Sequence, residues 1–276
     1  MDYTELGIRN GRPFTVSRGA DDTDIAFRIG LKNPSHTTLT AATITINAAT
    51  SAVVTITGGA TTTFAFATYT TMGTLLDAME LHADVGPYCW IRRCAMLRAW
   101  LTADLAALSA TSIRTNAGVS VLWDTSDLDR RAVCIGDEED STQAYGAARS
   151  SAATLPVEND GEEQLNQAFK ASDSLCAVRS VVITATWNAS AQTVEIYELT
   201  NKPGDSDPSA LFSYGFTGTG SAQTVNLGPP GMASLSASIG DGIRATRAGR
   251  RLLIVTGDGT NNITSSTVTA NGVIGQ

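Results

Sequence analysis

A serine with the potential to act as a nucleophile lies in the triplet Gly204-Asp205-Ser206, in a loop bracketed by prolines. Such a hydroxyl attacks an ester only when a histidine within hydrogen-bond distance takes its proton. The chain has two histidines, His36 and His82, and both precede the acidic region in the middle of the chain. The missing base favours a loop between strands over a catalytic site, so we expect that the protein is not an enzyme.

Carboxylates that could bind calcium occur in two segments. The oxygen ligands would come from Asp124, Asp127 and Asp129 in one segment and from Asp258, Asn261 and Asn262 in the other. A calcium loop needs six or more oxygens at defined spacing and usually a bidentate glutamate, which neither segment supplies. We therefore interpret these groups as solvated loop carboxylates, with a site shared at a subunit interface as the alternative, and we expect no metal and no cofactor.

The cysteines, Cys89, Cys94, Cys134 and Cys176, form no CxxC pair and have no histidine at ligand spacing. They fit neither a zinc site nor a dense disulfide framework. The N-terminus has no basic start followed by an apolar core, and the chain has no run of about 18 apolar residues. We expect a soluble protein made in a reducing cytosol, with buried free thiols and no membrane partner.

The net charge of −8 is concentrated in one region. Residues 124–163 contain eleven acids and three arginines, which leaves sixteen acids and sixteen basic residues in the remainder of the chain. An acidic total argues against nucleic-acid binding, for which a basic face supplies most of the affinity. Arginine outnumbers lysine by sixteen to three, which indicates either a GC-rich genome or interface pairing.

Four arginines, Arg244, Arg247, Arg250 and Arg251, fall in a predicted hairpin. A solvated turn explains them in the simplest way. The alternative is a docking surface for the acidic residues 137–163 of the same or a neighbouring subunit, because opposed patches of charge set the orientation of a contact.

The first half of the chain predicts an extended arm followed by a small α+β module. Residues 1–38 lack a sustained period, apart from a short strand near Ile25 to Ile29, and are interpreted as the arm. Within a module at 39–136, alternating apolar residues predict strands at 43–46, 53–57, 62–67, 88–92, 119–123 and 131–135. A 3.6-residue period after Tyr69 predicts a helix from a threonine cap to Gly86-Pro87, and residues 96–108 are ambiguous.

The second half predicts an acidic linker or surface excursion at 137–175, a β domain at 176–257 and a polar tail at 258–276. Strands are expected at 180–187, 193–199, 210–216, 223–227, 243–247 and 251–256. The predicted fold is therefore mainly β with a small α+β part: a strand–strand–helix module followed by an antiparallel β-sandwich or jelly roll.

Residues 33–76 contain no Asp, Glu, Lys or Arg, although the chain is 17% charged. Solvent-facing strands usually carry charge, because a flat neutral edge is a template for pairing with another chain. Thr45 and Thr55 are expected to face away from the apolar rows of their strands. We interpret this surface as one that meets a partner, with Thr45 and Thr55 as interface residues.

The run at 43–80, with Thr71-Met-Gly-Thr-Leu-Leu-Asp-Ala78 at its helix start, resembles a module of structural proteins of tailed bacteriophages. The C-terminal sandwich with its neutral tail resembles capsid decoration and cement proteins in style. The resemblance implies a non-enzymatic virion component, assembled in the host cytoplasm, that decorates or cements a capsid as a homo-oligomer, with a trimer favoured. Its partners would be the major capsid protein or other virion proteins.

Three other functions stay open from the sequence. A neck, tail or fibre component of the same kind of particle is the nearest alternative. A carbohydrate-binding or adhesive β-sandwich is the second, with Trp187, Tyr197 and Tyr214 as aromatic residues that could stack on sugars. A hydrolase similar to the GDS-type esterases, which share the Gly204-Asp205-Ser206 block, is the third.

Overall fold

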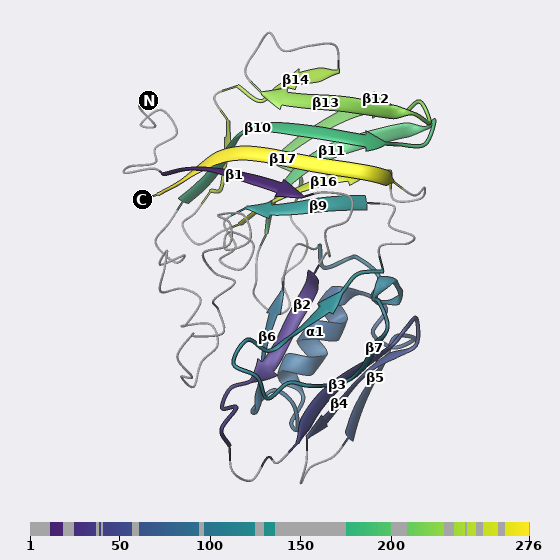
Figure 1. The fold of residues 1–276 in the computed structure, drawn as a ribbon, viewed down its shortest axis with the longest axis vertical. Coiled ribbons are helices and arrows are strands. Elements are labelled where there is room, and N and C mark those ends of the chain that lie inside the picture. Colours follow the sequence, from purple (N-terminus) through teal and green to yellow (C-terminus); the bar gives the residue numbers. More distant parts are fainter. Residues whose placement is uncertain are drawn as a thin grey trace.

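The structure is a computed structural model that describes residues 12–18, 25–36, 39, 41–56, 61–93, 97–124, 130–135, 175–199, 209–228, 235–240, 242–246, 251–258 and 263–275. These residues form four β-sheets and one α-helix, arranged as a small module and a larger sandwich (Figure 1). The mainly β fold with a small α+β part is confirmed. No helix in the described ranges is long and apolar enough to cross a membrane.

The module occupies the lower part of Figure 1 and contains two sheets and the helix α1 (Met72–Leu81). The four-stranded sheet has the order β5-β4-β3-β7 and the three-stranded sheet the order β6-β2-β8. Their bounds are β2 (Ile25–Leu31), β3 (Ala42–Asn47), β4 (Ser51–Ile56), β5 (Thr61–Ala65), β6 (Cys89–Arg93), β7 (Leu108–Ser112) and β8 (Val119–Leu122). A 3-10 turn, η2 (Thr102–Asp104), lies within the segment that was ambiguous in sequence.

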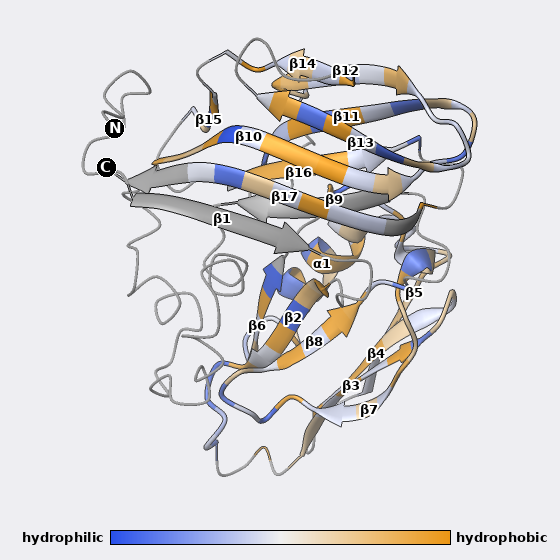
Figure 2. Ribbon diagram, turned by 45° about the horizontal axis from the view of Figure 1, so that its top comes forward, coloured by the Kyte–Doolittle hydropathy of each residue, from blue (hydrophilic) through white to orange (hydrophobic). Residues whose placement is uncertain are grey.

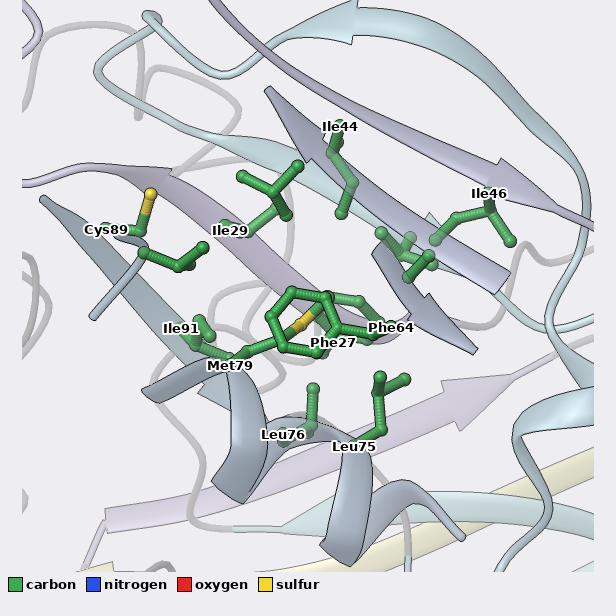
Figure 3. Close-up of a cluster of buried hydrophobic side chains, with 14 of the residues drawn as sticks. Phe27, Ile29, Ile44, Ile46, Phe64, Leu75, Leu76, Met79, Cys89 and Ile91 are labelled. Carbon is green, nitrogen blue, oxygen red and sulfur yellow. The ribbon is translucent and has the colours of Figure 1, made fainter. Parts of the chain in front are cut away.

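The apolar rows predicted from the sequence face the core of the module. Alternate residues of β3 and β4 are buried, and α1 turns Leu75, Leu76 and Met79 toward Phe27 and Phe64 (Figure 3). All five of these side chains have 1% or less of their surface exposed. Burial of a large apolar side chain contributes about 1.5–3 kcal/mol, so this cluster holds the helix on the sheets.

The helix begins where the sequence predicts and ends earlier. The Thr71 hydroxyl caps the Thr74 N–H, and the Thr74 hydroxyl caps Thr71 in return. The helix stops at Leu81 instead of continuing to Gly86-Pro87, because the backbone of His82 is extended, with φ −69° and ψ 132°. Gly86 lies so close to the helix that a Cβ there would be 2.0 Å from the Glu80 carbonyl oxygen.

The sandwich consists of two sheets packed face to face. One has the order β1-β17-β10-β13-β14, with β15 also paired to β10, and the other has the order β12-β11-β16-β9. Their bounds are β1 (Arg12–Arg18), β9 (Arg130–Ile135), β10 (Leu175–Thr186), β11 (Ala191–Leu199), β12 (Phe212–Thr217), β13 (Ala222–Gly228), β14 (Ser236–Ser238), β15 (Ile243–Arg244), β16 (Arg251–Gly257) and β17 (Thr264–Gly275).

The core of the sandwich lies between these sheets. Trp187 is fully buried and donates from Nε1 to Thr256 Oγ1 at 3.1 Å, which satisfies the polar group of the largest core side chain. Its ring meets that of Phe216 edge to face, with centroids 4.9 Å apart. The apolar middle of β10, seen in Figure 2, packs on this core from the sheet opposite β12 and β16. The predicted sandwich is therefore present.

The predicted arm and tail differ from the structure. β1, from the predicted arm, pairs along its whole length with β17, from the predicted tail, and β17 lies between β1 and β10. The other strand of the predicted arm, β2, is the central strand of the module's three-stranded sheet. The tail buries Ser266, Val268 and Ala270 at alternate positions, so small residues at a period of two are sufficient to face the core.

The predicted boundary at residue 136 also differs, because β9 is an edge strand of the sandwich and does not belong to the module. β9 pairs with β16, which is more than a hundred residues further along the chain. The prediction placed β9 in the module because β9 follows the module's strands in sequence. Residues 137–174 of the predicted acidic linker lie outside the described residues, and residue 175 is the first residue of β10.

Candidate interaction surface

The outward face of the β5-β4-β3-β7 sheet is built mostly from hydroxyl-bearing residues. Register places one row across all four strands, in the order Ser112, Thr43, Thr55 and Thr61. The next row contains Thr45, Val53 and Thr63. These side chains are partly or fully exposed, with the exposed ones at the edges. The face is therefore open, uncharged and covered by threonine hydroxyl and methyl groups.

Thr45 and Thr55 lie on this outward face, as the period of their strands predicts. Both belong to central strands, whereas the edges of the sheet are β5 and β7. They can contact a partner through the face and not through main-chain pairing. The Thr55 hydroxyl lies 3.3 Å from that of Thr61, so the row is linked by hydrogen bonding between neighbouring strands.

Of the predicted arginine cluster, Arg244 is fully described, and it belongs to the sandwich and not to the module that carries the threonine face. Arg244 is exposed on β15, which pairs with β10. The predicted strand at 243–247 is shorter than expected, because Thr246 turns away to donate its N–H and its hydroxyl to the carboxylate of Glu198. Arg247 and Arg250 lie outside the described residues, as does the side chain of Arg251, the first residue of β16.

The helix-start motif has structural roles at Thr71, Gly73 and Asp77. Thr71 caps the helix, and the N–H of Gly73 donates to the Arg98 carbonyl at 2.8 Å. A Cβ at Gly73 would lie 2.9 Å from the Arg98 Cβ, so glycine makes room for the crossing chain. Asp77 accepts two hydrogen bonds from the Arg98 guanidinium, one of them at 3.1 Å. The motif therefore binds the segment Leu97–Trp100 across the helix.

That segment carries the contact between the module and the sandwich. Leu97 and Trp100 pack against Leu253 and Val255 of β16, and Tyr197 of β11 joins them. On the module side, Trp100 meets Trp123 edge to face, with ring centroids 5.6 Å apart. Sequence reasoning missed Arg98 and Trp100, because they lie in the ambiguous segment 96–108. We name Leu97, Trp100, Tyr197, Leu253 and Val255 the intermodule contact.

The histidines have structural surroundings. His82 Nδ1 accepts from the Asp84 N–H at 3.1 Å, and its ring packs edge to face on Phe64. The His36 carbonyl lies 3.4 Å from an Arg114 guanidinium nitrogen that donates to it. The Gly204-Asp205-Ser206 block lies outside the described residues, so its loop interpretation stays a prediction.

The carboxylates proposed as calcium ligands are described only in part. Asp258 accepts from the Ser190 hydroxyl at 2.9 Å and from Gln192 Nε2 at 3.1 Å, which ties the β10–β11 turn to the end of β16. Asp127, Asp129, Asn261 and Asn262 lie outside the described residues. Within the described ranges, no three His, Cys, Asp or Glu residues come together as a metal site.

The aromatic residues considered for sugar stacking are held in other contacts. Trp187 is in the core, and Tyr197 belongs to the intermodule contact and donates its hydroxyl to Glu195. Tyr214 packs against the core and stacks on Phe216, with ring centroids 6.1 Å apart. A sugar-stacking aromatic residue needs one open ring face, so the buried Trp187 cannot serve, whereas Tyr197 and Tyr214 are partly exposed and their role stays a prediction.

Both cysteines whose side chains are described, Cys89 and Cys176, are buried free thiols. Burial raises the pKa of the Cys89 thiol to about 12, and the positive charge of Lys32 opposes this only in part. The thiolate is the reactive form, so Cys89 is unreactive near neutral pH.

Comparison of the chain with protein-family models, with curated proteins and with solved structures found no match.

Proposed function

We propose that the protein is a non-enzymatic structural component of a tailed-bacteriophage virion, which decorates or cements the capsid through its β-rich surfaces as a homo-oligomer. The observation that carries this proposal is the open threonine face of the module. The face of such a sheet is normally covered by another part of the protein or carries charged residues. Among the described residues, neither is found over the rows from Thr43 to Thr63.

The chemistry of the face suits a large, shallow contact. Threonine hydroxyls and methyl groups can pack against a protein surface without the cost of desolvating charges. Many weak contacts of this kind, repeated in every copy on a particle, give strong binding through multivalency. The major capsid protein, which repeats across a capsid, is the partner that such a surface fits.

The intermodule contact supports a mechanical role. Leu97 and Trp100 join the module to β16 of the sandwich through apolar packing, and the Arg98–Asp77 pair holds their segment on the helix. A component that bridges neighbouring subunits transmits load only if its own parts are firmly joined. A neck, tail or fibre position uses the same surfaces and is distinguished from a capsid position by where the chain lies on the particle.

The proposal is tested on particles purified from a culture whose phage carries the gene. Quantitative mass spectrometry should find the chain at a fixed ratio to the major capsid protein, and antibody labelling in the electron microscope should place it on the head. Labelling of the tail or neck would select the alternative within the same class. Absence of the chain from purified particles would overturn the proposal.

The enzymatic alternative has a separate test. Replacing Ser206 by Ala should leave any trace hydrolysis of model esters unchanged, because a serine without a base is a weak nucleophile near neutral pH. Loss of ester turnover in Ser206→Ala, with the fold intact, would reinstate a hydrolase.

A further inference from the structure

The edge of the threonine sheet at β5 exposes main-chain groups of two residues. The Phe66 N–H donates to the Thr50 carbonyl at 2.9 Å, across the β4–β5 hairpin. In an antiparallel pair, every second residue directs both main-chain groups toward the same neighbour, so Thr62 and Phe64 also face β4. Thr61 and Thr63 therefore direct their N–H and C=O groups away from β4, to the side where no described strand lies.

The open part of this edge is short and well defined. The next outward-facing carbonyl, that of Ala65, already accepts from the N–H groups of Thr68 and Tyr69 in the turn that follows. The available donors and acceptors are thus those of Thr61 and Thr63. Two residues of this spacing are self-complementary, because each N–H of one strand meets a C=O of an identical antiparallel strand.

Three of the other edge strands are protected by charge. The edge strands β1, β6 and β9 each contain two arginines, at Arg12 and Arg18, Arg92 and Arg93, and Arg130 and Arg131. Charge on an edge prevents pairing with another chain. β7, on the far side of the threonine sheet, is irregular, since its register with β3 shifts between Ile44 and Ile46. β5 has a regular register with β4 and no charged residue. The edge strands β8, β12 and β14 also lack charged residues, but β5 is the edge that continues the threonine face.

We propose that β5 pairs antiparallel with β5 of a second copy of this chain, around a two-fold axis at Thr62. Thr61 of each copy exchanges main-chain hydrogen bonds with Thr63 of the other copy. Thr62 then lies directly opposite Thr62 of the other copy. The two four-stranded sheets then form one continuous sheet, and the hydroxyl rows continue across the joint. This contact rests on the proposed function only in naming the oligomer, because it forms without a particle.

A second copy is favoured over an unrelated strand by the chemistry of the edge. The contact brings only Thr side chains together on the outward face, so no charge is desolvated and none is repelled. The resulting interface is isologous and closes at two copies, which limits growth to a dimer. The dimer differs from the trimer that the sequence favoured.

The direct test is a disulfide across the axis. Residues opposite each other in a non-hydrogen-bonded antiparallel pair have Cα atoms about 4.5 Å apart, within the range that a disulfide spans. The Thr62→Cys protein should therefore form a covalent dimer under mild oxidation. Thr45→Cys is the matched control, because strand spacing puts Thr45 on β3 about 24 Å from its copy. Wild-type protein gives the background from the natural cysteines.

The second test measures association without a new bond. Thr63→Pro removes an N–H that faces the open edge and leaves the pairing with β4 in place. Sedimentation equilibrium of the wild type should give a dimer, and Thr63→Pro should weaken association at least tenfold. A monomeric or trimeric wild type overturns the proposal, as does a dimer that Thr62→Cys fails to cross-link. Because no particle is used, either result leaves the proposed virion role to its own test.

Discussion

The two four-stranded sheets of this protein differ in what covers their outward faces. The sandwich sheet carries Tyr197, Leu253 and Val255 on its outward side, and the module covers them with Leu97 and Trp100. The four-stranded sheet of the module carries mainly threonines on its outward face, and nothing in the described part of the chain packs on them. The two faces have the same number of strands and opposite chemistry.

The chemistry of an outward row separates an internal contact from an external one. An apolar outward row must be buried permanently, and here the chain itself supplies the partner. A threonine row is stable in water, because its hydroxyls are solvated, and it can still pack against a partner through its methyl groups. The comparison therefore predicts stability effects at the first face and assembly effects at the second.

The largest effect is expected from Trp100→Ala. Trp100 contacts both Trp123 and the apolar side of β16, so its loss should destabilise the protein by about 2–3 kcal/mol, below the range for a fully buried tryptophan. Calorimetry should also show the single transition splitting into two, because the module and the sandwich have separate cores.

The neighbouring Leu101 provides the control, since 51% of its surface is exposed. Leu101→Ala should change the free energy of unfolding by less than about 0.5 kcal/mol. Equal effects of the two substitutions would mean that the intermodule contact does not join the parts.

A smaller effect is expected from Asp77→Asn. The carboxylate accepts two hydrogen bonds from Arg98, and the paired side chains are 15% and 19% exposed. Loss of one charge-assisted bond should cost about 1–2 kcal/mol in urea unfolding. Asp84→Asn removes the same charge from an exposed position and should have little effect. If the two variants had the same stability, the Arg98–Asp77 pair would not hold the segment.

The pH dependence of the free energy of unfolding tests the burial of the Cys89 thiol in the core of the module. Burial raises the pKa of the Cys89 thiol to about 12 from an ordinary value of 9.0. Between these values the folded state keeps a proton that the unfolded state loses, so the free energy of unfolding should fall as the pH rises above about 9. Cys89→Ala should show a smaller fall between pH 8 and pH 10. An identical slope in both proteins would contradict the raised pKa.

The sequence predicted the parts of the fold in which large apolar residues keep a regular period. Ile44, Ile46, Val54 and Phe64 face the core as their alternation indicates, and Thr71 caps the helix. The outward position of Thr45 and Thr55 followed from the same alternation. These features depend on local sequence, which a reading along the chain can follow.

The remaining features depend on contacts between distant residues. Half of the residues of β17 are Thr, Ser or Asn, and the strand is positioned by pairing with β1 and β10. Arg98 reaches Asp77 across twenty-one positions, and Trp100 finds its partners on β16. No period or motif marks such contacts, so the arm, the tail and the intermodule contact were beyond a local reading.

The central claim is that the threonine face meets a partner on the particle. Thr45→Lys and Thr55→Lys place a charge in the middle of this face, on side chains that are already partly exposed, so unfolding should change by less than about 0.5 kcal/mol. Binding to particles stripped of the protein should nevertheless weaken at least tenfold, because the charge must be desolvated in the contact. Wild-type occupancy by both folded variants would contradict the claim and leave the exposed Arg244 region of the sandwich as the next surface to test.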